Sequence, residues 1–88
     1  MNQHFATLVA MLAHSALLVL GEGKALGEGK PPEPDLAEAR SLIDILAMLA
    51  EKTKGNLADD EQNYLSGVLY DLRMRYVRAS SGAKGGPG

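Results

Sequence analysis

The residues that come closest to a known chemical motif are the glycines and lysines of a short duplication, LGEGK at 20–24 and again at 26–30. Phosphate-binding loops combine such residues, but they also need a Ser or Thr directly after the lysine and a fixed glycine spacing. Here Ala follows the first lysine and Pro the second. The dinucleotide-binding pattern fails as well, because no strand is expected before the glycines and their intervals are wrong. We therefore interpret the duplication as an expanded linker, since Gly- and Pro-rich segments act as spacers.

Metal binding and acid–base catalysis have no convincing set of residues. His4 and His14 are ten residues apart, so on one helix they lie on different faces and cannot bind one metal ion together. The chain has no cysteine, which excludes disulfides, thiolate zinc sites and a cysteine nucleophile. No carboxylate cluster or Ser/His/Asp set is recognisable. We expect a protein without enzyme activity and without catalytic, cofactor-binding or metal-binding residues.

Basic residues near the middle and end of the chain could form a surface patch: Lys52, Lys54, Arg73, Arg75 and Arg78. The whole chain nevertheless has 9 Lys and Arg against 11 Asp and Glu, a net charge of -2. Nucleic-acid binders need a basic field to displace the counterions of the phosphates. A solvated face is favoured over a binding role, with the two lysines complementing the dipole of a helix end. Nucleic acid is not an expected partner.

Three helices are predicted to position these residues. Apolar residues at helical spacing indicate the first helix, from Phe5 to Leu20, and Gly21 ends it. This helix is so apolar that most of its circumference is expected to be covered. It falls short of the ~20 residues that a bilayer requires, and no basic residue precedes it. A membrane partner is therefore not expected, and a cytoplasmic protein is. The stripe expected to face the core is Phe5, Leu8, Val9, Leu12, Ala16 and Val19.

The second and third helices are predicted to form a hairpin. The second runs over 36–54, begins at a capping box of Asp35 and Glu38, and ends at Gly55 in a left-handed conformation. The third begins at residue 58 or 59, and the short connection requires an antiparallel pair. The residues expected to face the core are Leu36, Ala39, Leu42, Ile43, Leu46, Leu49 and Ala50 in the second helix and Leu65, Val68, Leu69, Leu72 and Tyr76 in the third.

The fold class that follows is all-α, a small three-helix domain made of a long apolar N-terminal helix and an antiparallel helical hairpin. We assign residues 1–78 to this single domain, with a flexible Gly/Pro loop at 21–34, and 79–88 to a disordered tail. A core of this size is marginally stable by itself. Homo-oligomerisation is therefore an open alternative.

A second apolar stripe on the third helix is the strongest sign of a partner. Tyr70, Met74 and Val77 follow at i, i+4 and i+7, opposite the core stripe, and Ile45 and Met48 lie off the main stripe of the second helix. This is more apolar surface than a three-helix core needs. Contact with a partner or a second copy is favoured, and burial under the first helix is the alternative. The predicted partner interface is Ile45, Met48, Lys52, Lys54, Tyr70, Arg73, Met74 and Val77.

Most of the chain resembles a family of short bacterial proteins known as a domain of unknown function. The likeness lies in 5–21, 35–37, 39–40, 43–46, 48–49, 51–57 and 69–77. Within that family, the chain is similar to a cell-polarity protein of gliding bacteria. The chain departs from the family pattern at Ala58, where a capping Ser or Thr is common, and in its Gly-rich loop.

The resemblance implies a function without chemistry of its own. It implies a module that works with a response-regulator-like scaffold protein, stimulates nucleotide exchange on a small Ras-like GTPase, and is concentrated at a cell pole. It supplies no catalytic residues. Two alternatives stay open from the residues. One is a structural homo-oligomer that buries Tyr70 and Met74 and has no GTPase role, and the other is a nucleic-acid module that uses Arg73 and Arg75.

Overall fold

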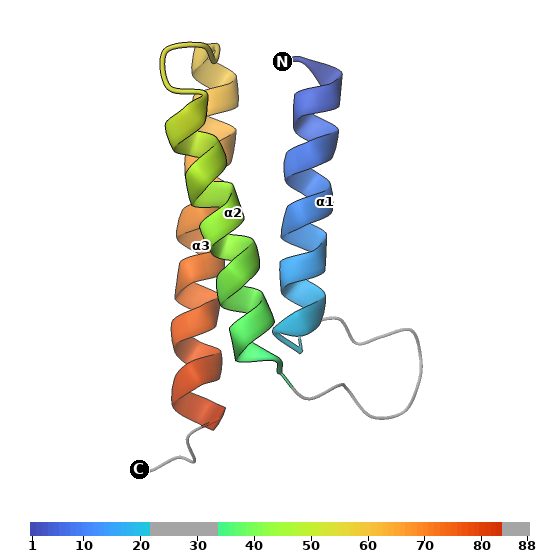
Figure 1. Ribbon diagram of the computed structural model, residues 1–88, viewed down its shortest axis with the longest axis vertical. Helices are drawn as coiled ribbons and strands as arrows, with labels where there is room; N and C mark the ends of the chain where they lie inside the picture. Colours follow the sequence, from blue (N-terminus) through green and yellow to red (C-terminus); the bar gives the residue numbers. More distant parts are fainter. Residues whose placement is uncertain (22–33, 84–88) are drawn as a thin grey trace.

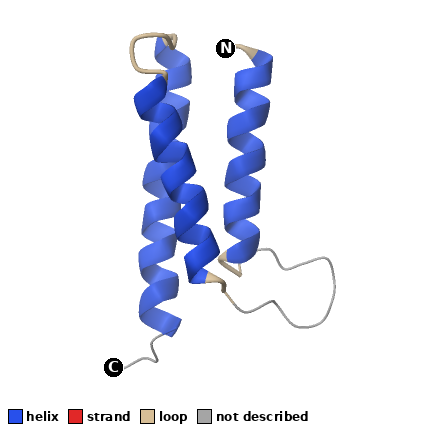
Figure 2. Cartoon of the chain, viewed as in Figure 1, coloured by secondary structure: helices blue, strands red, loops and turns tan. Residues whose placement is uncertain are grey.

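The computed structural model describes residues 1–21 and 34–83 of the 88-residue chain. These residues form three helices, α1 (Gln3–Val19), α2 (Leu36–Lys52) and α3 (Asp59–Ala83), and no strand occurs in this part of the chain (Figure 2). Successive helices run in opposite directions, so α1 and α3 point the same way and α2 points back (Figure 1). The predicted all-α, three-helix fold is confirmed. The duplicated segment lies almost entirely outside the described residues.

A backbone hydrogen bond holds the start of α2 against the end of α1. Gly21 has a φ of 82°, which is the left-handed conformation expected where a glycine ends a helix. At the start of α2, the Asp35 carboxylate accepts a hydrogen bond of 3.1 Å from the Glu38 N–H, as predicted for a helix cap. The N–H of Asp35 does not take part in the return half of a capping box. It donates instead to the carbonyl oxygen of Val19, at 2.6 Å.

The turn between α2 and α3 is short, and hydrogen bonds hold its polar groups. The helix ends at Lys52, two residues earlier than predicted, and Thr53 is its C-terminal cap. The Thr53 hydroxyl donates to the carbonyl oxygen of Leu49 at 2.7 Å, and its own carbonyl accepts from the Asn56 N–H at 2.8 Å. Gly55 has a φ of 85°, so the predicted left-handed glycine is confirmed.

The core lies along the centre of the bundle and receives side chains from all three helices. The predicted stripes of α2 and α3 are confirmed as buried or half-buried. In α1, however, Leu8 was expected in the core and is 42% exposed. Met11 and Leu18 are exposed as well, so α2 and α3 do not cover most of the circumference of α1. The buried apolar residues are Val9, Ala16, Leu20, Ala39, Leu42, Ile43, Leu46, Leu65, Leu69 and Leu72.

The arrangement of the helices explains this difference. Two neighbours can cover only one side of a helix, and α1 contacts α2 more extensively than it contacts α3. The third helix also differs from prediction at its end. It continues five residues beyond the expected boundary at residue 78, to Ala83. Ala79 packs against the core, which gives the additional turn of helix something to bury.

Candidate partner interface

The second apolar stripe of α3 is exposed to solvent. Tyr70, Met74 and Val77 are 69%, 46% and 58% exposed. They lie opposite the buried Leu65 and Leu72, because residues three or four apart share one face of a helix. The first helix does not cover them, so the alternative of burial under α1 is wrong. We call Tyr70, Met74 and Val77 the α3 stripe.

Two further residues of the predicted interface give α2 a smaller apolar surface of its own. Ile45 and Met48 are 39% and 47% exposed, and Lys52, one turn beyond Met48, is exposed too. Lys54 follows in the turn to α3 and is also exposed. The end of the hairpin therefore combines two apolar side chains with two cations.

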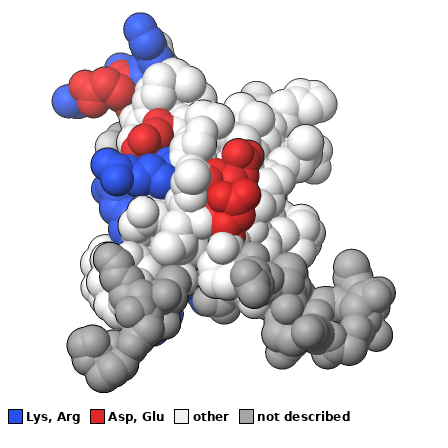
Figure 3. Space-filling view, turned by 60° about the horizontal axis from the view of Figure 1, so that its bottom comes forward, with Lys and Arg blue, Asp and Glu red and all other residues white. Residues whose placement is uncertain are grey.

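The predicted basic residues do not form one patch. Lys52 and Lys54 lie at the hairpin end, next to the start of α3. Arg73 lies 14 positions after Asp59, the first residue of α3, which is about 20 Å along the axis at 1.5 Å per residue. Figure 3 shows the blue atoms of Lys and Arg in separate groups. The alternative of a single basic patch is not realised, because the length of α3 keeps the lysines apart from Arg73.

One arginine of α3 is held by its own helix. The Arg75 Nε lies 2.8 Å from the Asp71 carboxylate, one turn earlier, and both side chains are partly exposed. An ion pair of this kind supports a helix by only ~0.3–0.5 kcal/mol. Asp71 borders the α3 stripe and gives it a charged edge on that side, and Arg75 lies beyond it, half-buried.

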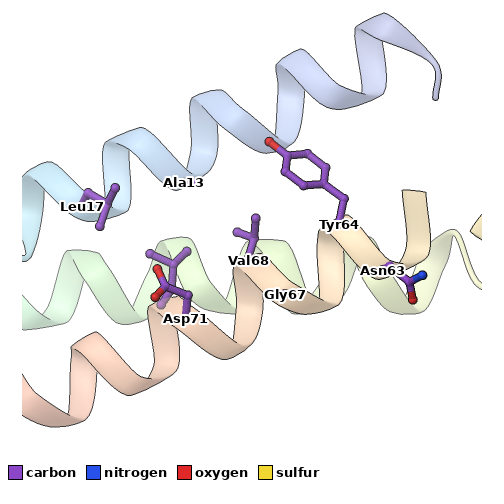
Figure 4. A pocket seen from close by; sticks show the side chains of 8 residues that line it. Ala13, Leu17, Asn63, Tyr64, Gly67, Val68 and Asp71 are labelled. Atoms are coloured by element: carbon purple, nitrogen blue, oxygen red, sulfur yellow. The ribbon is translucent and has the colours of Figure 1, made fainter. Parts of the chain in front are cut away.

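A groove between α1 and α3 was not foreseen from the sequence. It holds about 370 Å³ and is open to solvent. It exists because Ala13 and Gly67, on opposite walls, are small; a Cβ added at Gly67 would meet nothing within 4 Å. Figure 4 shows Tyr64 reaching from α3 toward α1, and Asp71 farther along the same wall. The groove is mainly apolar, with Asn63, Tyr64 and Asp71 as its polar groups.

Glu61 links the start of α3 to the start of α1. Its carboxylate accepts 2.8 Å from the N–H of Ala58 and 2.7 Å from the N–H of Asn2. The hydrogen bonds from Ala58 and Asn2 hold the pKa of Glu61 below its usual value of 4.5, because they favour the charged form. The side chain is buried. Both carboxylate oxygens are occupied by backbone donors, so Glu61 ties the start of α3 to the start of α1.

The sequence pattern indicates only one of the two hydrogen bonds of Glu61. Glu61 stands three residues after Ala58, the spacing of a capping box, in which the acid returns to the backbone N–H of the cap residue. Alanine at the cap position hid the pattern. The partner at Asn2 is 59 residues away, and no local pattern indicates it. Asn2 is itself the cap of α1, and its side-chain oxygen accepts 3.0 Å from the Phe5 N–H.

Residues 1–21 and 34–83 contain no group of three or more His, Cys, Asp or Glu side chains placed to hold a metal ion. None of the helices described in this part of the chain has the length and apolar character needed to cross a bilayer.

Comparison with protein families gave one result. The family described as "Domain of unknown function (DUF1844)" matches residues 2–78. The match spans all of α1 and α2 and most of α3. Neither the curated proteins nor the solved structures contained a match.

Proposed function

The chain belongs to the DUF1844 family, and from this premise we propose that it is a non-enzymatic interaction module of a complex that stimulates nucleotide exchange on a small Ras-like GTPase. The second component of the complex is a response-regulator-like scaffold protein. The proposal goes beyond family membership. It rests on the likeness of the chain to RomX, a polarity protein of gliding bacteria. It includes a role in cell polarity and motility, a cytoplasmic location and concentration at a cell pole.

The observation that supports it most is the exposed α3 stripe. An exchange factor needs no reactive group, since it lowers nucleotide affinity by binding the open conformation of the GTPase better than the closed one. Each tenfold change in affinity requires about 1.4 kcal/mol of differential binding. Tyr70, Met74 and Val77 are about half exposed or more. Burying the rest of each would contribute on the order of 1 kcal/mol, of which the part made only with the open conformation favours nucleotide exchange.

A second surface supports the two-partner form of the proposal. Ile45 and Met48 on α2, with Lys52 and Lys54 beyond them, belong to a different helix from the α3 stripe. A module that joins a scaffold to a GTPase needs two separate contacts. We assign the α3 stripe to the GTPase and the hairpin end to the scaffold, where the two lysines would meet acidic groups.

The test is the release rate of a fluorescent guanine nucleotide from the GTPase, with scaffold protein present. We expect the wild-type chain to accelerate release and the Tyr70→Ala/Met74→Asp variant to lose most of the acceleration. Ala37→Asp is the matched control. It adds the same charge to an exposed site of α2, in a first turn where the helix dipole favours an acid. Helix content and thermal unfolding of both variants must match wild type.

The proposal fails if wild-type chain with scaffold leaves the release rate unchanged. It also fails in its assignment of surfaces if the folded double variant is as active as wild type. The alternative of a structural homo-oligomer built on Tyr70 and Met74 predicts a different result. In that case the double variant lowers the mass of the assembly and no GTPase is affected.

A further inference from the structure

The outward face of α1 is an exposed apolar strip without any charge. Leu8, Met11 and Leu18 are 42%, 60% and 39% exposed, and the whole helix contains no Lys, Arg, Asp or Glu. Figure 3 shows a white area on the side of α1, to the right of the charged groups. Charged residues normally occupy such a solvent face. Exposed apolar side chains on one face of a helix mark contacts with other molecules.

The spacing along this strip is that of a coiled-coil seam. His4, Leu8, Met11, Ser15 and Leu18 follow one another at intervals of four, three, four and three residues. This is the heptad spacing that keeps side chains on the line facing a partner helix. Every one of these residues is exposed. The core of the bundle uses the other side of α1, through Val9 and Ala16, so the strip is a second seam.

The order of residues in the strip specifies a second copy of the same strip, packed antiparallel. Two antiparallel copies centred between Val9 and Ala10 place Leu8 opposite Met11 of the partner, and His4 opposite Ser15 of the partner. Leu18 lies past the start of the partner's helix, which begins at Gln3. Within the paired helices each layer is thus matched, apolar with apolar and polar with polar. Each pairing occurs twice, as the two-fold symmetry of an isologous interface demands.

The absence of charged residues on α1 also favours a second copy of the chain as its partner. A partner recognised by charge would find no counter-charge on α1, whereas two copies of α1 meet without repulsion. The α3 stripe is different, because Asp71 and Arg73 stand on its two borders. A partner of another kind would find counter-charges there. We therefore propose that the protein forms an antiparallel homodimer through the outer face of α1, separate from the surfaces that the proposed function assigns to other proteins.

The size of the contact sets its expected strength. A helix of 17 residues is about 25 Å long. One helix face of that length covers less than the ~800 Å² per partner of a standard interface. We therefore expect reversible dimerisation with a dissociation constant on the order of micromolar or weaker.

The experiment uses charge pairs that only the antiparallel register brings together. In full-length chain, we expect Leu8→Glu alone and Met11→Lys alone to sediment as monomers over the micromolar range, where wild type shows a rising dimer fraction. An equal mixture of the two variants should recover the dimer, because Glu at 8 then faces Lys at 11 of the partner. Both positions are exposed, so the fold tolerates them, and matching circular dichroism spectra check this.

Each other outcome overturns the proposal. A wild-type monomer at all concentrations removes it. Variants that dimerise as well as wild type, or a mixture that stays monomeric, rule out this register. If Tyr70→Ala/Met74→Asp abolishes the dimer and the α1 variants do not, the seam lies on α3. If wild type stays monomeric and binds vesicles of neutral lipid, and Met11→Lys prevents this, the strip contacts lipid and not a second copy.

The direction of the pair has an independent readout, because the chain contains no cysteine. In the antiparallel arrangement the two Leu18 positions lie about 25 Å apart, at opposite ends of the helix pair. Leu18→Cys alone should therefore resist oxidation to a cross-linked dimer, whereas a mixture of Leu8→Cys and Met11→Cys should cross-link. Efficient cross-linking of Leu18→Cys with itself would show a parallel pair and overturn the proposal.

Discussion

The carboxylate of Glu61 and the backbone N–H of Asn2 form a hydrogen bond of 2.7 Å across 59 positions of sequence. It joins the first turn of α3 to the N-terminal cap of α1. The other carboxylate oxygen holds the N–H of Ala58, so one side chain completes the start of α3 and fixes the start of α1 beside it. The terminal ammonium of Met1 lies 3.3 Å from the neighbouring Asp60 carboxylate and adds an exposed ion pair at the same place.

Loss of Glu61 should loosen the start of α1 before the rest of the bundle. In Glu61→Ala, the N–H groups of Asn2 and Ala58 lose their acceptor, so we expect faster hydrogen exchange at these two amides and in the first turn of α1. Exchange in the middle of α2, around Leu46, should stay close to wild type. Glu38→Ala is the control, since that side chain is exposed. Uniform acceleration throughout the chain would contradict a local role.

The same carboxylate predicts a pH dependence of stability. Because the pKa of Glu61 is lower in the folded chain than its usual value of 4.5, its contribution is fully present above that value. It is lost as the pH falls through the folded pKa. Asp60 opposes this shift and the Met1 ammonium supports it, both more weakly than the hydrogen bonds. Chemical unfolding measured from neutral pH to below pH 4.5 should show a smaller loss of stability in Glu61→Gln than in wild type. Equal losses of stability in both proteins would show that Glu61 does not cause the pH dependence.

The cap of α2 should be worth as much as an ordinary N-cap. Asp35→Ala removes the acceptor for the Glu38 N–H and should lower the free energy of unfolding by about 1 kcal/mol. The backbone bond from Asp35 to Val19 survives this substitution. Asp44→Ala, an exposed change in the middle of the same helix, should stay within about 0.5 kcal/mol of wild type. Urea unfolding measures both, and equal effects would contradict the capping role.

Two glycines should respond to alanine in opposite directions. Gly55 has a positive φ, so Gly55→Ala should cost about 1–2 kcal/mol although the space for a methyl group is open. Gly67 lies inside α3 and a Cβ there meets nothing within 4 Å. Gly67→Ala should therefore stabilise the protein by roughly 0.5–1 kcal/mol. Thermal unfolding of the two variants side by side is sufficient. A stabilising Gly55→Ala would show that the turn is not held in this conformation.

Two apolar residues of α2, two positions apart, should differ widely in how much their substitution by alanine lowers stability. Leu46 is fully buried and Met48 is 47% exposed. Leu46→Ala should lower the free energy of unfolding by about 2–5 kcal/mol, because it leaves a cavity in the core. Met48→Ala should change it by no more than about 0.5 kcal/mol. Denaturant unfolding distinguishes them, and similar losses would mean that Met48 is covered in solution.

Local patterns were enough to predict most of the fold. The helical spacing of Leu42, Leu46, Leu65 and Leu72 identified the two stripes of the hairpin, and Gly55 marked its turn. These features depend on residues near one another in sequence. The end of α3 was placed too early because the Ser and Gly composition after residue 78 argues against helix, whereas packing of Ala79 against the core favours it.

Features that depend on the arrangement of helices could not be predicted. Whether Leu8 is inside or outside depends on which side of α1 the other two helices occupy, and the periodicity of α1 fits two faces. The groove beside Gly67 depends on how closely α1 approaches α3. The exposure of Tyr70 and Met74 agrees with the predicted stripe, but their role as a partner interface stays a prediction.

The contact between Val19 and Asp35 also bears on how this chain tolerates changes in length. The two ends of the intervening segment meet at one point, so the helices need no particular number of residues between them. Doubling a connecting segment costs only about 0.6 kcal/mol in closure entropy. A tandem copying event such as the LGEGK repeat can therefore survive selection without a compensating change in the bundle. The segment between Val19 and Asp35 is therefore the natural place to insert an epitope or a fluorescent reporter.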